Sequence, residues 1–221
     1  MKPLGVRDIT RKEKIEHDGK TILEINLCAP LFECESKREG DRLNGYYEEA
    51  LDGFYGFCKN KFSKTLLQKK CCRKGGAVMK WYIPFANDSA MSVIVEASLY
   101  DGKTRLSERF ISNWLLDGCV PLRSDDAFSV SRKAVRGYIE AIQSKIEKRE
   151  GGFSYYKNAS SLALRAFRKD NFYLTPNGVA FYYPRGVLTD KSEKAPVFVI
   201  PYESISGMKF ASVNIGVPLL K

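Results

Sequence analysis

The segment from about residue 38 to residue 71 constrains the fold more than any other part of the chain. Its apolar residues recur at three- and four-residue steps, which places them along one side of an α-helix. They are Leu43, Tyr47, Ala50, Leu51, Phe54, Cys58, Phe62 and Leu66. The pattern predicts one long amphipathic helix, which Gly75-Gly76 is expected to end. We further expect the glycines inside it, Gly45, Gly53 and Gly56, to permit close packing on a sheet.

The segments around this helix change to the two-residue period of strands. The predicted strands are residues 21–32, 77–86, 91–99, 104–116, 171–175, 179–183 and 197–200. Asp18-Gly19 and Asn177-Gly178 are typical hairpin turns because both pairs tolerate positive φ. A medium helix is predicted over residues 129–149, where Ser129 or Ser131 can cap it, and a short helix over 155–167.

These elements predict an α+β fold, with an antiparallel β-sheet and one long and one medium helix packed across it. A chain of 221 residues fits a single domain over residues 1–221. Two lobes are the alternative. Residues 1–125 would then hold the N-terminal hairpin, the long helix and the meander, and residues 126–221 the second helix and the C-terminal strands. Residues from 207 onward fit an appended strand or a loose tail.

The chain is basic, with 36 Lys and Arg residues against 26 Asp and Glu residues and a net charge of +10. Such a surface favours anionic partners such as an acidic protein, a cell-wall polymer or nucleic acid. The densest group of cations lies in the second half of the long helix. Within it, Lys61, Lys64, Lys69 and Lys70 are the candidates for polyanion binding.

No catalytic, cofactor-binding or metal-binding motif is recognisable. The six cysteines form no CxxC pair, and we expect them to be reduced and mostly buried. The only histidine, His17, lies in a predicted turn, so a Ser-His or Cys-His dyad would depend on that one residue. We therefore expect no enzymatic activity and no cofactor. The adjacent acids Asp125-Asp126 and Glu48-Glu49 leave a carboxylate-dependent enzyme as an alternative.

The N-terminal residues are charged and lack the apolar region of a signal peptide. No apolar run approaches the roughly 20 residues that a membrane span requires. We expect a soluble protein without a membrane span. It would be cytoplasmic if Met1 is the natural start, and extracytoplasmic if the chain is part of a trimmed sequence.

The C-terminal third carries a recognisable motif. It begins at Phe172-Tyr173-Leu174-Thr175, continues through Gly178, Phe181 and Tyr182, and ends at Ile200-Pro201-Tyr202. This motif resembles the signature of a bacterial domain family of unknown function, the RsiV-like C-terminal domain. That family includes the sensing domain of the lysozyme-responsive anti-sigma factor RsiV and the non-catalytic region of the peptidoglycan deacetylase PdaC. Because the matching residues are aromatic and turn residues, we interpret them as structural.

The resemblance implies a non-catalytic recognition module that binds a protein or an anionic cell-wall ligand. Lysozyme is itself basic, so an acidic protein or wall polymer fits a chain of charge +10 better. Relatives carry a Gly-Gly-Ala-His loop where this chain has Asp101-Gly102-Lys103-Thr104-Arg105, so any role of that histidine is absent. Binding of a polyanion or nucleic acid through the basic helix is the first alternative, and the carboxylate-dependent enzyme is the second.

Overall fold

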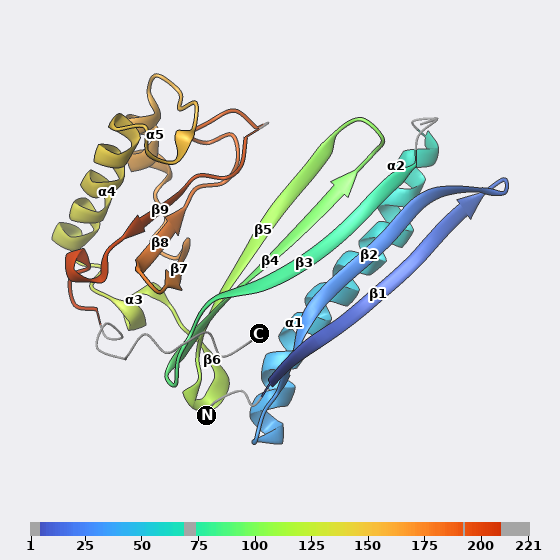
Figure 1. Ribbon diagram of the computed structural model, residues 1–221, viewed down its shortest axis with the longest axis horizontal. Helices are drawn as coiled ribbons and strands as arrows, with labels where there is room; N and C mark the ends of the chain where they lie inside the picture. Colours follow the sequence, from blue (N-terminus) through green and yellow to red (C-terminus); the bar gives the residue numbers. More distant parts are fainter. Residues whose placement is uncertain (1–4, 69–73, 192, 209–221) are drawn as a thin grey trace.

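The computed structural model describes residues 5–68, 74–191 and 193–208 and contains two lobes (Figure 1). The N-terminal lobe is a six-stranded sheet with a long helix along one face. The C-terminal lobe is a three-stranded sheet covered by two helices, α4 and α5. This arrangement confirms the predicted α+β class.

The N-terminal lobe comprises β1 (Gly5–His17), β2 (Lys20–Glu33), α1 (Lys37–Phe57), a π-helical turn (Cys58–Phe62), α2 (Ser63–Gln68), β3 (Gly75–Ala86), β4 (Ala90–Tyr100), β5 (Arg105–Leu115), a 3₁₀ turn (Asp117–Cys119) and β6 (Val120–Pro121). The C-terminal lobe comprises α3 (Ser124–Ala127), α4 (Arg132–Glu147), a 3₁₀ turn (Glu150–Gly152), α5 (Ala159–Ala166), β7 (Phe172–Thr175), β8 (Gly178–Tyr182), β9 (Val197–Ile200) and a 3₁₀ turn (Tyr202–Ser204).

The strands of the large sheet follow chain order, from β1 to β6, and one pair departs from the antiparallel pattern. Strand β2 pairs with β3 in parallel, with Leu23 opposite Gly75 and Leu27 opposite Met79. The long helix causes this departure. It carries the chain from the end of β2 back toward the level where β2 began, and a crossover of this kind joins parallel strands. The hairpins on either side remain antiparallel.

Helix α1 is tied to the sheet at its N-terminal end. The Ser36 side chain caps the helix by accepting a hydrogen bond from the Glu39 N–H. About two turns beyond the cap, the Asn44 side chain bonds both the N–H and the carbonyl of Phe32, at 2.7 and 2.9 Å. These bonds set the helix against the end of β2, and its buried face then includes Leu43, Tyr47 and Leu51.

The long helix differs from its prediction in three ways. A π-helical turn interrupts it after Phe57, just where the buried residues Cys58, Phe62 and Leu66 follow a four-residue step. The π turn takes more residues than the 3.6 of an α-helical turn, so it keeps such residues nearer to one line. Gly75-Gly76 does not end the helix but opens β3. The interior glycines do not pack on the sheet either, because a Cβ atom at Gly45, Gly53 or Gly56 would meet nothing within 4 Å.

The two sheets are joined by a small buried hydrogen-bond network. The Ser92 hydroxyl of β4 donates to the Asn113 amide oxygen of β5 at 2.6 Å and accepts from the Leu174 N–H of β7 at 2.9 Å. The Asn113 Nδ2 donates to the Phe172 carbonyl at 2.8 Å. Ile94 packs beside this network against Tyr173. Backbone groups of β7 thus bond to side chains of the large sheet, which holds the lobes together at one end of β4 and β5.

Three smaller elements differ from the sequence prediction. The short helix α5 begins at Ala159 and not at residue 155. Helix α3 and strand β6 were not predicted. The tail predicted after residue 207 lies outside the described residues from 209 onward. Within the described ranges, no helix is both long enough and apolar enough to cross a membrane.

Candidate binding cleft

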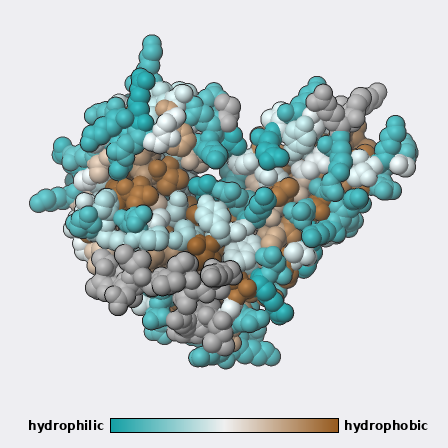
Figure 2. Space-filling model, viewed as in Figure 1, coloured by the Kyte–Doolittle hydropathy of each residue, from teal (hydrophilic) through white to brown (hydrophobic). Residues whose placement is uncertain are grey.

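A cleft of about 670 Å³ lies between the face of β3, β4 and β5 that is turned away from α1 and the segment after β8. The space-filling view shows the molecule hollowed between its lobes, with hydrophilic residues on both rims (Figure 2). The lining residues are Asn26, Val78, Lys80, Glu96, Ala97, Ser98, Arg105, Ser107, Glu108, Arg109, Tyr182, Pro184, Arg185, Lys194 and Ala195. The cleft is therefore built by strands of one lobe and a loop of the other.

Basic side chains dominate the charge of the cleft. Five basic residues and two acidic ones line it, an excess of three positive charges. Within the described part of the chain, Lys80, Arg105 and Lys194 form no ion pair. Arg185 is held differently, since its Nε donates to the Glu193 carbonyl at 2.7 Å. Uncompensated cations in a recess between two lobes raise the local concentration of anionic ligands.

The floor of the cleft is an ion pair between two neighbouring strands. Arg109 of β5 stands opposite Glu96 of β4, and its Nε and Nη2 donate to Glu96 Oε1 at 3.1 and 2.6 Å. Burial acts to lower the pKa of Arg109, but the hydrogen bonds to Glu96, with a smaller contribution from Tyr82, leave that pKa above its ordinary value. The arginine therefore stays charged, and two charge-assisted hydrogen bonds to one carboxylate oxygen fix its position.

Three tyrosines from three strands surround this ion pair. Tyr82 comes from β3, Tyr173 from β7 and Tyr182 from β8, and each interacts electrostatically with Arg109. Burial is the main cause that raises the pKa of each hydroxyl, so all three stay neutral at physiological pH. Of this group, Arg109 and Tyr182 line the cleft, and both the guanidinium and the neutral hydroxyl are hydrogen-bond donors.

The structure separates the motif residues from the lysine candidates. In the motif, Phe172, Leu174, Gly178, Phe181 and Ile200 are buried in the C-terminal lobe. Tyr182 and Tyr173 instead contribute to the surroundings of the cleft. The remaining motif residues, Thr175, Pro201 and Tyr202, lie together at the β7–β8 turn, where the Tyr202 hydroxyl donates to the Thr175 carbonyl at 2.6 Å.

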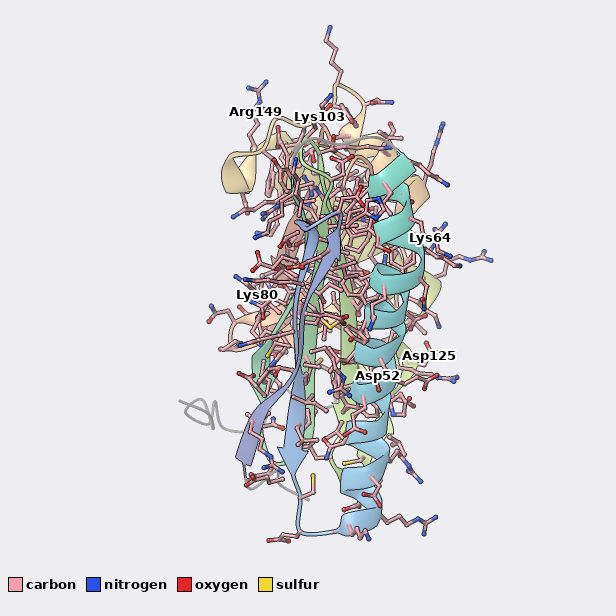
Figure 3. All side chains as sticks on the ribbon, turned by 90° about the vertical axis from the view of Figure 1, so that its right-hand side faces the viewer. Asp52, Lys64, Lys80, Lys103, Asp125 and Arg149 are labelled. Carbon is pink, nitrogen blue, oxygen red and sulfur yellow. The ribbon has the colours of Figure 1, made fainter. Side chains whose placement is uncertain are left out.

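The lysine candidates lie on the other side of the large sheet. Lys61 and Lys64 are exposed on the π turn and α2, and Lys69 and Lys70 fall outside the described residues. Figure 3 places Lys64 on the outer side of the helix and Lys80 on the opposite side of the sheet. The helix and the cleft are therefore two separate basic surfaces, and sequence reasoning considered only the helix. The one sequence signal for the cleft was the alternation of Arg105, Ser107 and Arg109 along a strand.

The groups considered for catalysis do not meet in the cleft. Asp125 of α3 pairs with Lys169 at 2.6 Å, and Glu48 and Glu49 lie on α1. The described residues contain no group of three His, Cys, Asp or Glu side chains able to hold a metal ion. The described cysteines are free thiols; Cys58 and Cys119 are buried, and Cys28 and Cys34 are half-buried.

No family sequence model matches the chain, and curated protein sequences gave no match either. Solved structures that share the fold include two bacterial proteins. One is a DUF3298 family member, BF2082, from Bacteroides fragilis NCTC 9343, with 16% identity, a TM-score of 0.66, and coverage of 96% of this chain and 98% of the other. The second is a DUF3298 family protein, PA4972, from Pseudomonas aeruginosa PAO1, with 14% identity, a TM-score of 0.62, and coverage of 92% and 93%. The chain therefore has the fold of these two bacterial DUF3298 proteins over nearly its whole length.

Proposed function

We propose that this protein is a non-catalytic recognition module that binds an anionic ligand in the cleft between its lobes. The observation that carries the proposal is the set of cations at the cleft mouth, Lys80, Arg105 and Lys194, which have no acidic partner among the described residues. Arg109, which is held by Glu96, and Tyr182 also line the cleft. The chemistry that fits this arrangement is a carboxylate- or phosphate-bearing ligand, from an acidic protein or an anionic wall polymer.

The basic helix is the competing surface, and part of its charge is already neutralised. Lys59 pairs with Glu13 of β1 at 3.0 Å, and the pKa of that carboxyl is lowered by its hydrogen bonds to Tyr55 and Lys59. Lys61 and Lys64 are exposed to solvent, where salt screens their charges strongly. The cleft presents its cations to a ligand from two sides, so it is favoured over the helix.

Two double variants with the same change of charge separate these surfaces. Lys80→Glu with Arg105→Glu reverses the cleft mouth, and Lys61→Glu with Lys64→Glu reverses the helix. The probe is poly-L-glutamate, and its affinity is measured by biolayer interferometry at low salt and at roughly 0.3 M salt. We expect the cleft variant to lose at least about tenfold in affinity, from two lost charge contacts. The helix variant is expected to change by less than about threefold. Loss of binding in the helix variant alone would reject the cleft and support polyanion binding by the helix.

A further inference from the structure

In the described part of the chain, one edge of strand β5 has no partner strand for most of its length. The other edge of β5 pairs with β4 from Arg105 to Leu115. On the open side, the short β6 reaches only Trp114 and Leu115. Among the described residues, no strand pairs with this side of β5 before Trp114. Such an edge presents unpaired N–H and C=O groups and is a template for another strand.

The direction of the free backbone groups follows from one hydrogen bond. The Leu122 N–H donates to the Asn113 carbonyl at 2.7 Å, so the Asn113 backbone points away from β4. In an antiparallel strand the direction alternates with every residue. The backbone groups of Ser107, Arg109 and Ile111 therefore also point outward, whereas those of Leu106, Glu108 and Phe110 point toward β4.

The two faces of this edge differ in chemistry. Arg105, Ser107 and Arg109 are on the face that lines the cleft. The opposite face carries Leu106 and Phe110, which are 65% and 55% exposed. Helix α1 contacts β5 further along the strand, where Tyr47 bonds Ser112 and Trp114. Glu108 lies between them in sequence, yet it also lines the cleft. Four residues of β5, Arg105 and Ser107 to Arg109, thus line the recess, so the cleft follows this strand along its exposed part.

We infer that the cleft binds an extended peptide segment that adds to the edge of β5 as an extra strand and alternates acidic and apolar side chains. The inference rests on the proposed function and names its ligand class. Acidic side chains would face Arg105 and Arg109, and apolar ones would cover Leu106 and Phe110. The main-chain hydrogen bonds would come from Ser107 and Arg109, as in other cases of strand addition. The stretch from Arg105 to Phe110 offers about 20 Å, enough for about six residues.

A second copy of this chain fits the edge less well than an acidic peptide does. It would carry the same net charge of +10. An antiparallel pair of β5 strands centred on Glu108 would set that carboxylate opposite itself, and one centred on Ser107 would set Arg105 opposite Arg109. Like charges directly opposite destabilise a strand pair. Charge complementarity therefore selects an acidic partner.

The test uses a probe that follows the alternation of β5, the blocked peptide Glu-Val-Glu-Thr-Glu-Val, with Thr placed to face Glu108. A peptide of the same composition in the order Glu-Glu-Glu-Val-Val-Thr carries the same charge without alternation. Ser107→Pro removes the outward N–H at the centre of the edge, and proline is tolerated where that N–H faces solvent. Ser107→Ala removes only the hydroxyl and is the matched control. Thermal unfolding of both variants is measured as a check that they fold.

We expect the alternating peptide to bind at least about tenfold more tightly than the reordered one. We also expect Ser107→Pro to reduce its affinity about tenfold, and Ser107→Ala to leave it unchanged. N-methylation of the peptide at the backbone nitrogens that would face β5 should also reduce its affinity about tenfold. This second test leaves the protein unchanged, so it does not depend on the stability of Ser107→Pro. Amide NMR shifts on binding should be largest at Ser107, Arg109 and Ile111.

Equal affinity of both peptides, or no effect of Ser107→Pro and of methylation, would overturn the strand inference. The proposed function would survive that result if charge reversal at Lys80 and Arg105 still abolished binding of poly-L-glutamate. A concentration-dependent dimer of the unmodified protein that Ser107→Pro converts to a monomer would also overturn it, because the occupant of the edge would then be a second copy.

Discussion

Replacing Gly178 by alanine should destabilise the C-terminal lobe strongly. Gly178 begins β8 with φ at 149°, a value that residues with a side chain rarely adopt. A Cβ atom there would lie 2.1 Å from the Ile200 carbonyl oxygen and 2.9 Å from Pro201 Cα. These are main-chain atoms of and beside β9, so no rotation of a side chain relieves the clash. Strands β8 and β9 would have to separate.

The size of the effect follows from two costs. Overpacking a well-packed interior costs about 1–3 kcal/mol, and an unfavourable backbone conformation costs about 1–3 kcal/mol more. Alanine reduces the entropy of the unfolded chain and returns about 0.5–1 kcal/mol. The expected loss in the free energy of unfolding is therefore about 1–5.5 kcal/mol, measured by urea denaturation. Gly137→Ala is the matched control: it lies in α4 with nothing within 4 Å of its Cβ position, and it should stabilise the protein by about 0.5–1 kcal/mol.

A Gly178→Ala protein that unfolds within about 0.5 kcal/mol of the parent, with an unchanged slope against urea, would refute this reasoning. It would mean that β8 and β9 yield at no cost, and that Gly178 is not required by close approach of the two strands. Destabilisation by Gly137→Ala equal to that by Gly178→Ala would also refute it, since the effect would then not depend on the local clash.

Two further predictions concern buried groups in the N-terminal lobe. The Tyr47 hydroxyl accepts from Trp114 Nε1 at 2.8 Å and lies 2.7 Å from the Ser112 hydroxyl, so Tyr47→Phe removes the partner of the buried Trp114 N–H. The substitution should cost about 2–3 kcal/mol in chemical denaturation and shift the tryptophan fluorescence, and an unchanged midpoint would contradict this. Burial raises the pKa of Cys28, Cys58 and Cys119 to about 11, so only about 0.1% of each thiol is ionised at pH 8. Labelling of these cysteines by a disulfide reagent, located by mass spectrometry, should therefore be slow and accelerate about tenfold per pH unit. Fast labelling of these sites in the folded protein at pH 8 would contradict this prediction.

Local features of this fold were predictable because they depend on neighbours in the chain. Asp18 and Gly19 both adopt positive φ in the β1–β2 turn, as the Asp-Gly pair predicts. Ser131 caps α4 through its bond to the Ala134 N–H at 3.2 Å. The two-residue period likewise predicted β3, β4 and β5 to within about two residues. Backbone preference, capping and alternation all act over a few residues, so the sequence by itself determines them.

The binding cleft was decided by the tertiary structure alone. Its cations come from β3, β5 and the segment after β8, separated by up to about a hundred residues in the chain, and no run of charge marks them. The parallel pairing of β2 with β3 depends on where the long helix returns the chain. The position of the lobes depends on Ser92 and Asn113, whose side chains satisfy the backbone of β7. A serine or asparagine in a strand carries no sign of a distant partner, because that partner exists only once the two sheets have packed.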